Sequence, residues 1–180
     1  MARCAWTNEN NPLYVRYHDE EWGVPTHDDR DLFELLILEG FQAGLSWECV
    51  LNKRDAFRAA FDNFDVVAVS GYDDTKCEEL LQNAAIIRNR RKVYAAVSNA
   101  QVFREIQAAY GSFDRYIWGF TGGQVVREPY TQRTTSPLSD TISDDLKRRG
   151  MRFVGSTIIY SYLQAIGVLN AHGKECDLGK

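Results

Sequence analysis

The sequence lacks long apolar runs, internal repeats and a dense set of cysteines. Nowhere do about 18 uncharged apolar residues follow one another, so we expect no membrane-spanning helix. The first residues, MARCAWTNENNPLY, contain no apolar core of a secretory signal peptide. The four cysteines are scattered, which favours metal binding or simple burial over a set of disulfides. Together these absences predict a cytoplasmic protein.

Positive charge is also scarce for a protein that would bind nucleic acid. The formal net charge is -4, whereas nucleic-acid-binding domains usually carry a basic footprint. Any contact with a phosphate backbone must therefore depend on local clusters. Two exist, at 88–92 (RNRRK) and 147–152 (KRRGMR). The second also suits the C-terminal end of an ordinary helix.

Alternation of apolar and polar residues is almost absent, whereas helical spacing of apolar residues recurs along the chain. With 180 residues, 44% of them hydrophobic, the chain can form one domain with its own core. We therefore predict an all-α fold in a single domain over residues 1–180. The expected helices span 28–39, closed by Gly40, then a segment from Ser46 toward Phe61, then 73–83, 90–109, 112–119, 140–149 and 156–170. We expect short strand-like runs at 124–126 and 151–154, a loop over 122–137, and irregular chain over 1–25.

Residue types that bind metals occur in pairs at the two ends of the chain. The pair near the C-terminus has the i,i+4 spacing that places both residues on one face of a helix. Two cysteines and two histidines satisfy a closed tetrahedral zinc site, which is structural rather than catalytic. The predicted ligands are Cys4, His18, His172 and Cys176. The alternative is that these are buried free cysteines and surface histidines.

Aromatic residues crowd into the first 22 residues, and a further tryptophan follows the next helix. They are Trp6, Tyr14, Tyr17, Trp22 and Trp47. Aromatic side chains usually belong to a core. In a segment without helical or strand periodicity they can instead line a pocket in which a planar base stacks.

Glu39 follows an apolar LLIL run and precedes Gly40, which places a carboxylate at the C-terminal end of a helix. This position opposes the helix dipole at a cost of roughly 0.3–1 kcal/mol. A local rule broken without visible compensation is a reason to suspect function. The alternative is a solvated glutamate at a frayed helix end.

Two connections between helices also have a structural and a functional interpretation. Gly44 permits a left-handed turn from which Leu45 would project, either as an ordinary connection or as a wedge. The basic run at 88–92 joins a short helix to a longer one, as in a helix–hairpin–helix unit that holds a phosphate. A solvated helix face would also explain that run.

Several stretches together carry a resemblance to a known family. They are RCAW at 3–6, YHDEEWGVP at 17–25, LFELLILEGFQAGLSWECVLNKR at 32–54, IIRNRRK at 86–92, SDTISDDLKRRGMRFVGSTIIYSYLQAIGVLNAH at 139–172, and Cys176. In these stretches the chain resembles the 3-methyladenine DNA glycosylase I family, a branch of the helix–hairpin–helix DNA glycosylases.

The resemblance implies a monofunctional glycosylase of base excision repair, which flips 3-methyladenine out of alkylated double-stranded DNA and hydrolyses its N-glycosidic bond. It implies a monomer that needs no protein partner and no membrane, and one structural zinc ion. The zinc would join residues 1–25 and 165–180 into a lobe. The implied roles are base recognition by Glu39, a pocket wall of Trp6, Tyr14, Tyr17, Trp22, Gln42, Trp47 and Ser161, and DNA contacts by Gly44, Leu45, Arg88, Arg91 and Lys92.

Two positions depart from the family pattern. Ala85 stands where glycine is usual in the hairpin, and Ala171 replaces the usual aspartate before His172. Two other functions remain open from the residues alone. One is a zinc-stabilised module that binds damaged DNA without cutting it. The other is a hydrolytic metal centre, which would need an open coordination position that two Cys and two His ligands do not leave.

Overall fold

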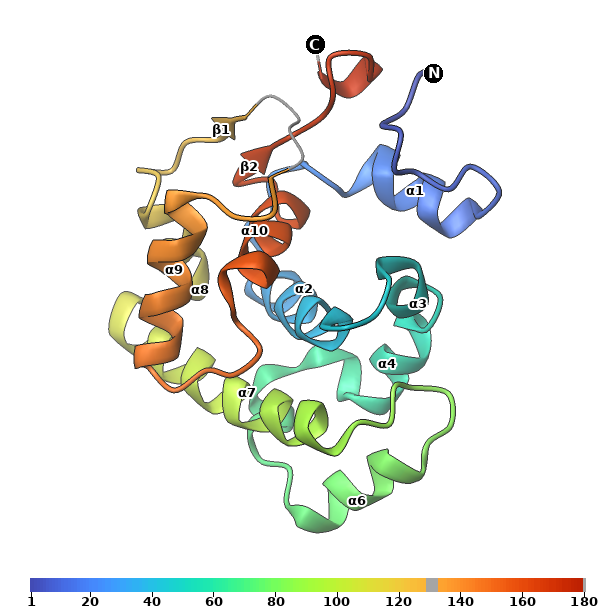
Figure 1. Cartoon of the computed structure of the whole chain (residues 1–180). Coiled ribbons are helices and arrows are strands. Elements are labelled where there is room, and N and C mark those ends of the chain that lie inside the picture. The colour runs from blue at the N-terminus through green and yellow to red at the C-terminus, as the bar shows by residue number, and fades with distance from the viewer. Residues whose placement is uncertain (129–132, 180) are drawn as a thin grey trace.

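A computed structural model describes residues 1–128 and 133–179, in which helices provide most of the secondary structure (Figure 1). The α-helices are α1 (Pro12–Glu20), α2 (Asp29–Gln42), α3 (Trp47–Leu51), α4 (Arg54–Ala60), α5 (Val66–Ser70), α6 (Asp74–Gln82), α7 (Arg90–Tyr110), α8 (Phe113–Gly119), α9 (Pro137–Arg148) and α10 (Ser156–Ala165). The other described elements are the 3-10 helices η1 (Asp62–Phe64) and η2 (Asp177–Gly179) and the strands β1 (Val126–Arg127) and β2 (Leu169–Asn170). The predicted helical fold class is confirmed. No helix in these residues is both long and apolar enough to cross a membrane.

Helix α2 lies at the centre of the molecule, where α3, α7, α8 and α10 pack against it (Figure 1). Every residue from 32 to 41 is buried, because neighbours cover the helix on all sides. The helix begins after Asp28, whose side chain accepts hydrogen bonds from two backbone N–H groups. It continues to Gln42, so the prediction that Gly40 ends it is wrong. The left-handed backbone after the helix belongs instead to Gly44, at φ 78°.

The segment after α2 forms two short helices in place of the single helix that we expected. Ser46 caps α3 as predicted, through a hydrogen bond from the backbone N–H of Cys49. The chain then bends at Asn52 and Lys53 before α4 begins. Asn52 accepts a hydrogen bond from a side chain of the N-terminal segment, and Lys53 donates to the carbonyl of Ala85 at 3.1 Å. These contacts hold a bend that a continuous helix would remove.

Helix boundaries in the middle of the chain agree closely with the predictions. Helices α6, α7 and α8 match the expected 73–83, 90–109 and 112–119 to within one residue at each end. Helix α9 begins at Pro137 rather than at 140, because Ser136 and Ser139 form a capping box ahead of the expected start. The loop predicted over 122–137 includes residues 129–132, which lie outside the described residues.

Helix α10 ends at Ala165, short of the predicted 170, because Gly167 turns the chain with φ 75°. A Cβ at this glycine would lie only 2.3 Å from the carbonyl carbon of Val24, so only glycine fits there. Strand β2 then pairs in parallel with β1, which partly confirms the strand-like run at 124–126. The run at 151–154 forms a bend instead of a strand.

The two ends of the chain differ from the predictions. Residues 1–25 were expected to be irregular, yet they contain α1, which starts at a proline after the capping residue Asn11. The predicted helix face shared by His172 and Cys176 is wrong, because no helix spans these residues. A turn brings them together instead, closed by a hydrogen bond from the N–H of Cys176 to the carbonyl of Gly173 at 2.9 Å.

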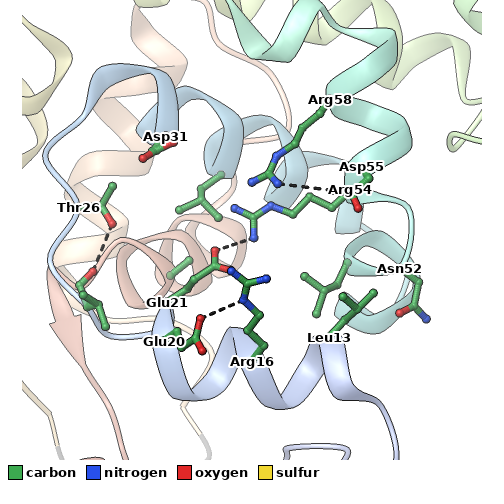
Figure 2. Close-up of a pocket in the computed structure, with 14 residues that line it drawn as sticks. Leu13, Arg16, Glu20, Glu21, Thr26, Asp31, Asn52, Arg54, Asp55 and Arg58 are labelled. Atoms are coloured by element: carbon green, nitrogen blue, oxygen red, sulfur yellow. Dashed lines mark hydrogen bonds and ion pairs between the residues drawn. The ribbon is translucent and has the colours of Figure 1, made fainter.

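A charged pocket of about 420 Å³ lies between α1, α2 and α4 (Figure 2). In this pocket Arg54 donates a hydrogen bond to Glu21 at 2.6 Å. Arg54 also forms an ion pair with Glu34, whose side chain is fully buried. Arg30 and Arg58 bind the same carboxylate. Burial alone would raise the pKa of Glu34, but these arginines outweigh it and leave that pKa below its ordinary value. The network joins α2 to α4 through the interior.

Replacing Glu34 by glutamine should lower the free energy of unfolding by about 3 kcal/mol, because the guanidinium of Arg54 stays buried with less compensation. Urea unfolding would measure the loss. The matched control is Glu20→Gln, which removes an exposed pair with Arg16 and should cost less than about 1 kcal/mol. Equal effects of the two variants would contradict the prediction.

Candidate active site and metal centre

An aromatic cavity of about 420 Å³ lies between the N-terminal segment, α2, α3 and α10. The sequence predicted that eight residues share one pocket, and the structure places all eight on the wall of this cavity. They are Trp6, Tyr14, Tyr17, Trp22, Glu39, Gln42, Trp47 and Ser161. The wall also contains residues that were not predicted from the sequence, namely Arg133, Thr134, Thr157, Tyr160, Gln164 and Ala171. Thr157 and Gln164 lie on the same face of α10 as Ser161, so helical spacing was a signal that would have found them.

Ring contacts hold the aromatic wall together. Trp6 packs edge-on against Tyr14 and Trp22, with ring centroids 5.6 Å and 4.7 Å apart. Tyr17 packs at a tilt against Trp47, with centroids 5.1 Å apart. Such tilted and edge-on arrangements are those that aromatic quadrupoles favour. Because the rings come from the N-terminal segment, α1 and α3, they fix these three parts of the chain relative to one another.

Glu39 is a buried carboxylate in the last turn of α2. The residue is 2% exposed, and its Oε2 forms no hydrogen bond with any described residue. Burial raises the pKa of this carboxyl group from 4.5 to about 8. The alternative of a solvated glutamate at a frayed helix end is therefore excluded.

A second buried polar group on the cavity wall also lacks a partner. The indole Nε1 of Trp47 makes no hydrogen bond with any residue in the described part of the chain. Each buried group left unpaired costs roughly 1–3 kcal/mol, so native proteins rarely keep two of them without a reason. A ligand that donates to Glu39 and accepts from Trp47 would satisfy both.

The turn after α2 has the shape that the sequence predicts. Gly44 adopts φ 78°, and no atom lies within 4 Å of the position that a Cβ would take, so backbone conformation rather than space favours glycine. Leu45 is 41% exposed, so its side chain is accessible to solvent at this turn. Its N–H donates to the carbonyl of Gln42 at 2.6 Å, which keeps the turn tight.

The basic run at 88–92 divides into an exposed part and a buried part. Arg88 and Arg91 are exposed beside the hairpin of residues 83–89, which joins α6 to α7. Lys92 is only 7% exposed, and its ammonium group donates to two backbone carbonyls. The expectation that Lys92 contacts DNA does not fit this placement, because the packing of α7 against α2 turns its side chain inward. Ala85 has no positive φ, so the hairpin does not require glycine there.

The four predicted metal ligands meet at one buried point. The Sγ atoms of Cys4 and Cys176 lie 3.7 Å and 3.5 Å from Nδ1 of His172. Cys176 Sγ also lies 3.6 Å from Nε2 of His18, and all four ligand atoms lie within 4.8 Å of one another. Sulfur and nitrogen bound tetrahedrally to one ion, at about 2.3 Å and 2.0 Å, would be separated by about 3.5 Å. The donor set therefore fits a metal ion.

Outer contacts orient both imidazole rings toward this point. Nδ1 of His18 contacts a carboxylate oxygen of Asp19 at 2.8 Å, and Arg3 holds that carboxylate with two of its nitrogens. Nε2 of His172 donates to the carbonyl of Trp22 at 3.2 Å. These bonds leave Nε2 of His18 and Nδ1 of His172 facing the thiols, as is usual around metal-bound histidines. Asp19 was not predicted from the sequence, although its place directly after His18 was a signal.

Residues 6–179 match the methyladenine glycosylase family. The chain belongs to this family.

Individual relatives of this methyladenine glycosylase agree with that placement. DNA-3-methyladenine glycosylase 1 of Escherichia coli K12 is 43% identical over 183 residues, which cover 98% of this chain and 96% of the relative. A crystal structure of a 3-methyladenine DNA glycosylase I matches with a TM-score of 0.94 at 43% identity, and covers 99% of this chain and 100% of that one. A tyrosine-to-phenylalanine variant of a 3-methyladenine DNA glycosylase I, in complex with 3-methyladenine, matches with a TM-score of 0.95 at 34% identity, and covers 100% and 98%. The predicted family membership is confirmed.

Glu39 should make the stability of this methyladenine glycosylase depend on pH. Its pKa is about 8 in the folded protein, above the ordinary 4.5 expected of the unfolded chain. Both states are protonated at low pH, and stability is lost as pH rises from 4.5 through 8, because only the unfolded chain ionises freely. Glu39→Gln should therefore be more stable than the wild type at about pH 9, by on the order of a few kcal/mol, and not below pH 4.5. Urea unfolding across this range measures the effect, and a difference independent of pH would contradict it.

Proposed function

We propose that this methyladenine glycosylase removes 3-methyladenine from alkylated double-stranded DNA by hydrolysis and leaves an abasic site. The observation that carries the proposal is the unpaired carboxylate of Glu39 inside the aromatic cavity. The relatives are named for the same base, and one of those proteins is in complex with it. The cavity volume also lies in the range of roughly 300–1,000 Å³ that is usual for small-molecule sites.

Charge provides the selection between damaged and normal adenine. Methylation at N3 makes adenine cationic, and aromatic faces attract a cation by about 0.5–2 kcal/mol per contact. A cation in the cavity would also lower the pKa of Glu39, so that the carboxylate ionises and accepts hydrogen bonds from the base edge. Neutral adenine provides no such charge and would leave the cost of burying the carboxylate uncompensated.

The bond to be broken is already weak, because the base leaves as a neutral molecule. The electron pair of the N-glycosidic bond moves to the cationic base, water adds to the sugar carbon, and one proton is released. The protein therefore needs positioning more than acid catalysis. The described wall of the cavity contains no lysine that could form a Schiff base with the sugar. We infer a monofunctional enzyme, which acts as a monomer.

DNA would approach across the turn of Gly44 and Leu45 and the hairpin before α7. Leu45 would fill the gap that a flipped base leaves in the stack. Arg88 and Arg91 are exposed beside the hairpin, where backbone N–H groups and a helix N-terminus favour a phosphate. Flipping costs a few kcal/mol, and least for damaged pairs, so this step adds to selectivity.

We assign zinc to the cluster of two cysteines and two histidines. The set leaves no open coordination position, so the ion would be structural and would supply no step of the reaction. Its ligands lie directly behind the aromatic wall, because the ring of His172 packs edge-on against Trp22 at 4.6 Å. His18 packs against Trp6 at 5.3 Å in the same way. The proposed ion therefore stabilises the cavity wall as well as the termini.

Release of free 3-methyladenine from methylated duplex DNA, measured by chromatography, tests the activity. The wild type should release the base, and Glu39→Gln should lower the single-turnover rate by roughly 100-fold, because the charged acceptor is lost. The control is Glu48→Gln, because the carboxylate of Glu48 accepts hydrogen bonds from Asn8 and Asn11 outside the cavity. This variant should excise the base at a rate near that of the wild type. DNA binding without base release by the wild type would instead favour a non-catalytic recognition module.

Metal content tests the zinc assignment. Purified protein should contain about one zinc ion per chain, and Cys176→Ala should lose it and melt at a lower temperature, because one of the four ligands is gone. Cys49→Ala is the matched control, since Cys49 lies outside the cluster and its loss should leave the zinc content unchanged. Zinc-free wild-type protein, or full zinc content in Cys176→Ala, would overturn the assignment.

A further inference from the structure

Lys92 lies inside the protein, although its neighbours in the basic run are exposed. Its ammonium group donates to the carbonyls of Phe41 at 2.8 Å and Ala43 at 2.6 Å. Burial lowers the pKa of Lys92, the nearby Cys49 opposes this shift only in part, and no described carboxylate pairs with the ammonium group. Burying a cation without a carboxylate partner costs free energy, which the hydrogen bonds to these two carbonyls offset in part.

The two carbonyls belong to the C-terminal end of α2. The last carbonyls of any helix lack partners within it, and a cation nearby is favoured by the helix dipole. Helix α2 has no basic residue in its own last turn, and the N–H of Ala43 reaches the carbonyl of Gly40 only at 3.4 Å. Lys92 therefore supplies from α7 the C-terminal cap that α2 lacks.

This contact joins the two parts of the chain that are proposed to touch DNA. Lys92 lies in the first turn of α7, directly after the exposed Arg91. Ala43 comes two residues before Leu45, at the start of the proposed wedge. A second contact comes from the bend between α3 and α4, where Lys53 donates to the carbonyl of Ala85 in the hairpin at 3.1 Å. The hairpin and the wedge are thus held in one fixed relation.

We propose that Lys92 is a positioning residue, which fixes the turn of Leu45 relative to the phosphate-binding hairpin so that the wedge enters the stack at the lesion. The proposal rests on the function proposed above. It assigns Lys92 no contact with the base or with DNA. Loss of Lys92 should therefore impair excision from duplex DNA and leave the aromatic cavity able to bind its ligand.

The test compares Lys92→Met, which keeps length but not charge, with Leu45→Ala and the double variant. Single-turnover excision from methylated duplex DNA should fall about tenfold in each single variant. Leu45→Ala removes the wedge itself, whereas Lys92→Met removes the contact that positions it. The double variant should be no more than about threefold slower than Leu45→Ala, because variants that act through one element are not additive. The control for loss of a lysine charge is Lys76→Met on α6, which should leave the rate unchanged.

Two binding measurements distinguish positioning from a general structural role. Affinity for free 3-methyladenine, followed by tryptophan fluorescence, and affinity for undamaged duplex should each change less than about twofold in Lys92→Met. A parallel loss of base affinity and excision would show a damaged cavity and overturn the proposal. Unchanged excision, or losses that multiply to about 100-fold in the double variant, would also overturn it.

Melting curves verify that the variants are folded at the assay temperature. If Lys92→Met does not fold, Lys92→Gln takes its place, because its amide keeps a donor without the charge. Base release by the wild type separates the two proposals. Without it the proposed function fails, whereas release with additive variants contradicts only the role of Lys92.

Discussion

Burial of α2 on every side is the constraint on which the rest of the structure depends, because it decides the state of two carboxylates. Glu34 and Glu39 both lie inside the protein on this one helix. Three arginines surround Glu34 and lower its pKa, whereas no ion pair is formed by Glu39 within the described residues, and burial raises its pKa to about 8. The first glutamate holds α2 to its neighbours. The second has a buried carboxylate oxygen without a hydrogen-bond partner on the wall of the aromatic cavity, and a cationic base would supply that partner.

The cavity and the cluster of Cys4, His18, His172 and Cys176 share a wall. Trp6 and Trp22 line the cavity on one side and pack against His18 and His172 on the other. These tryptophans come from a segment with little regular structure, so side-chain contacts must hold them in place. The proposed structural ion would lie directly behind this wall, where the four buried ligand side chains meet.

Local chemistry made part of the fold and site predictable, and tertiary packing decided the rest. Serine is a common N-cap, so the start of α3 at Ser46 could be predicted. The position of Glu39 at the C-terminal end of a helix was also visible from its neighbours in sequence. Gly40 is an ordinary helix terminator by sequence, yet it lies inside α2, buried against Phe153. Lys92 could not be distinguished from the exposed arginines around it, because only the packing of α7 on α2 turns it inward. The turn at His172 likewise depends on a partner at the far end of the chain.

The clasp between the two termini has a topological consequence. Ala2 and Asp177 exchange two hydrogen bonds, and the ligands Cys4 and Cys176 meet directly beside them. These contacts close residues 2–177 into one ring. Closing so long a loop costs little more entropy than closing one half its length. A circular permutant that joins these ends and opens the chain at an exposed connection should keep the same core, whereas trimming a few residues from either end would open the ring.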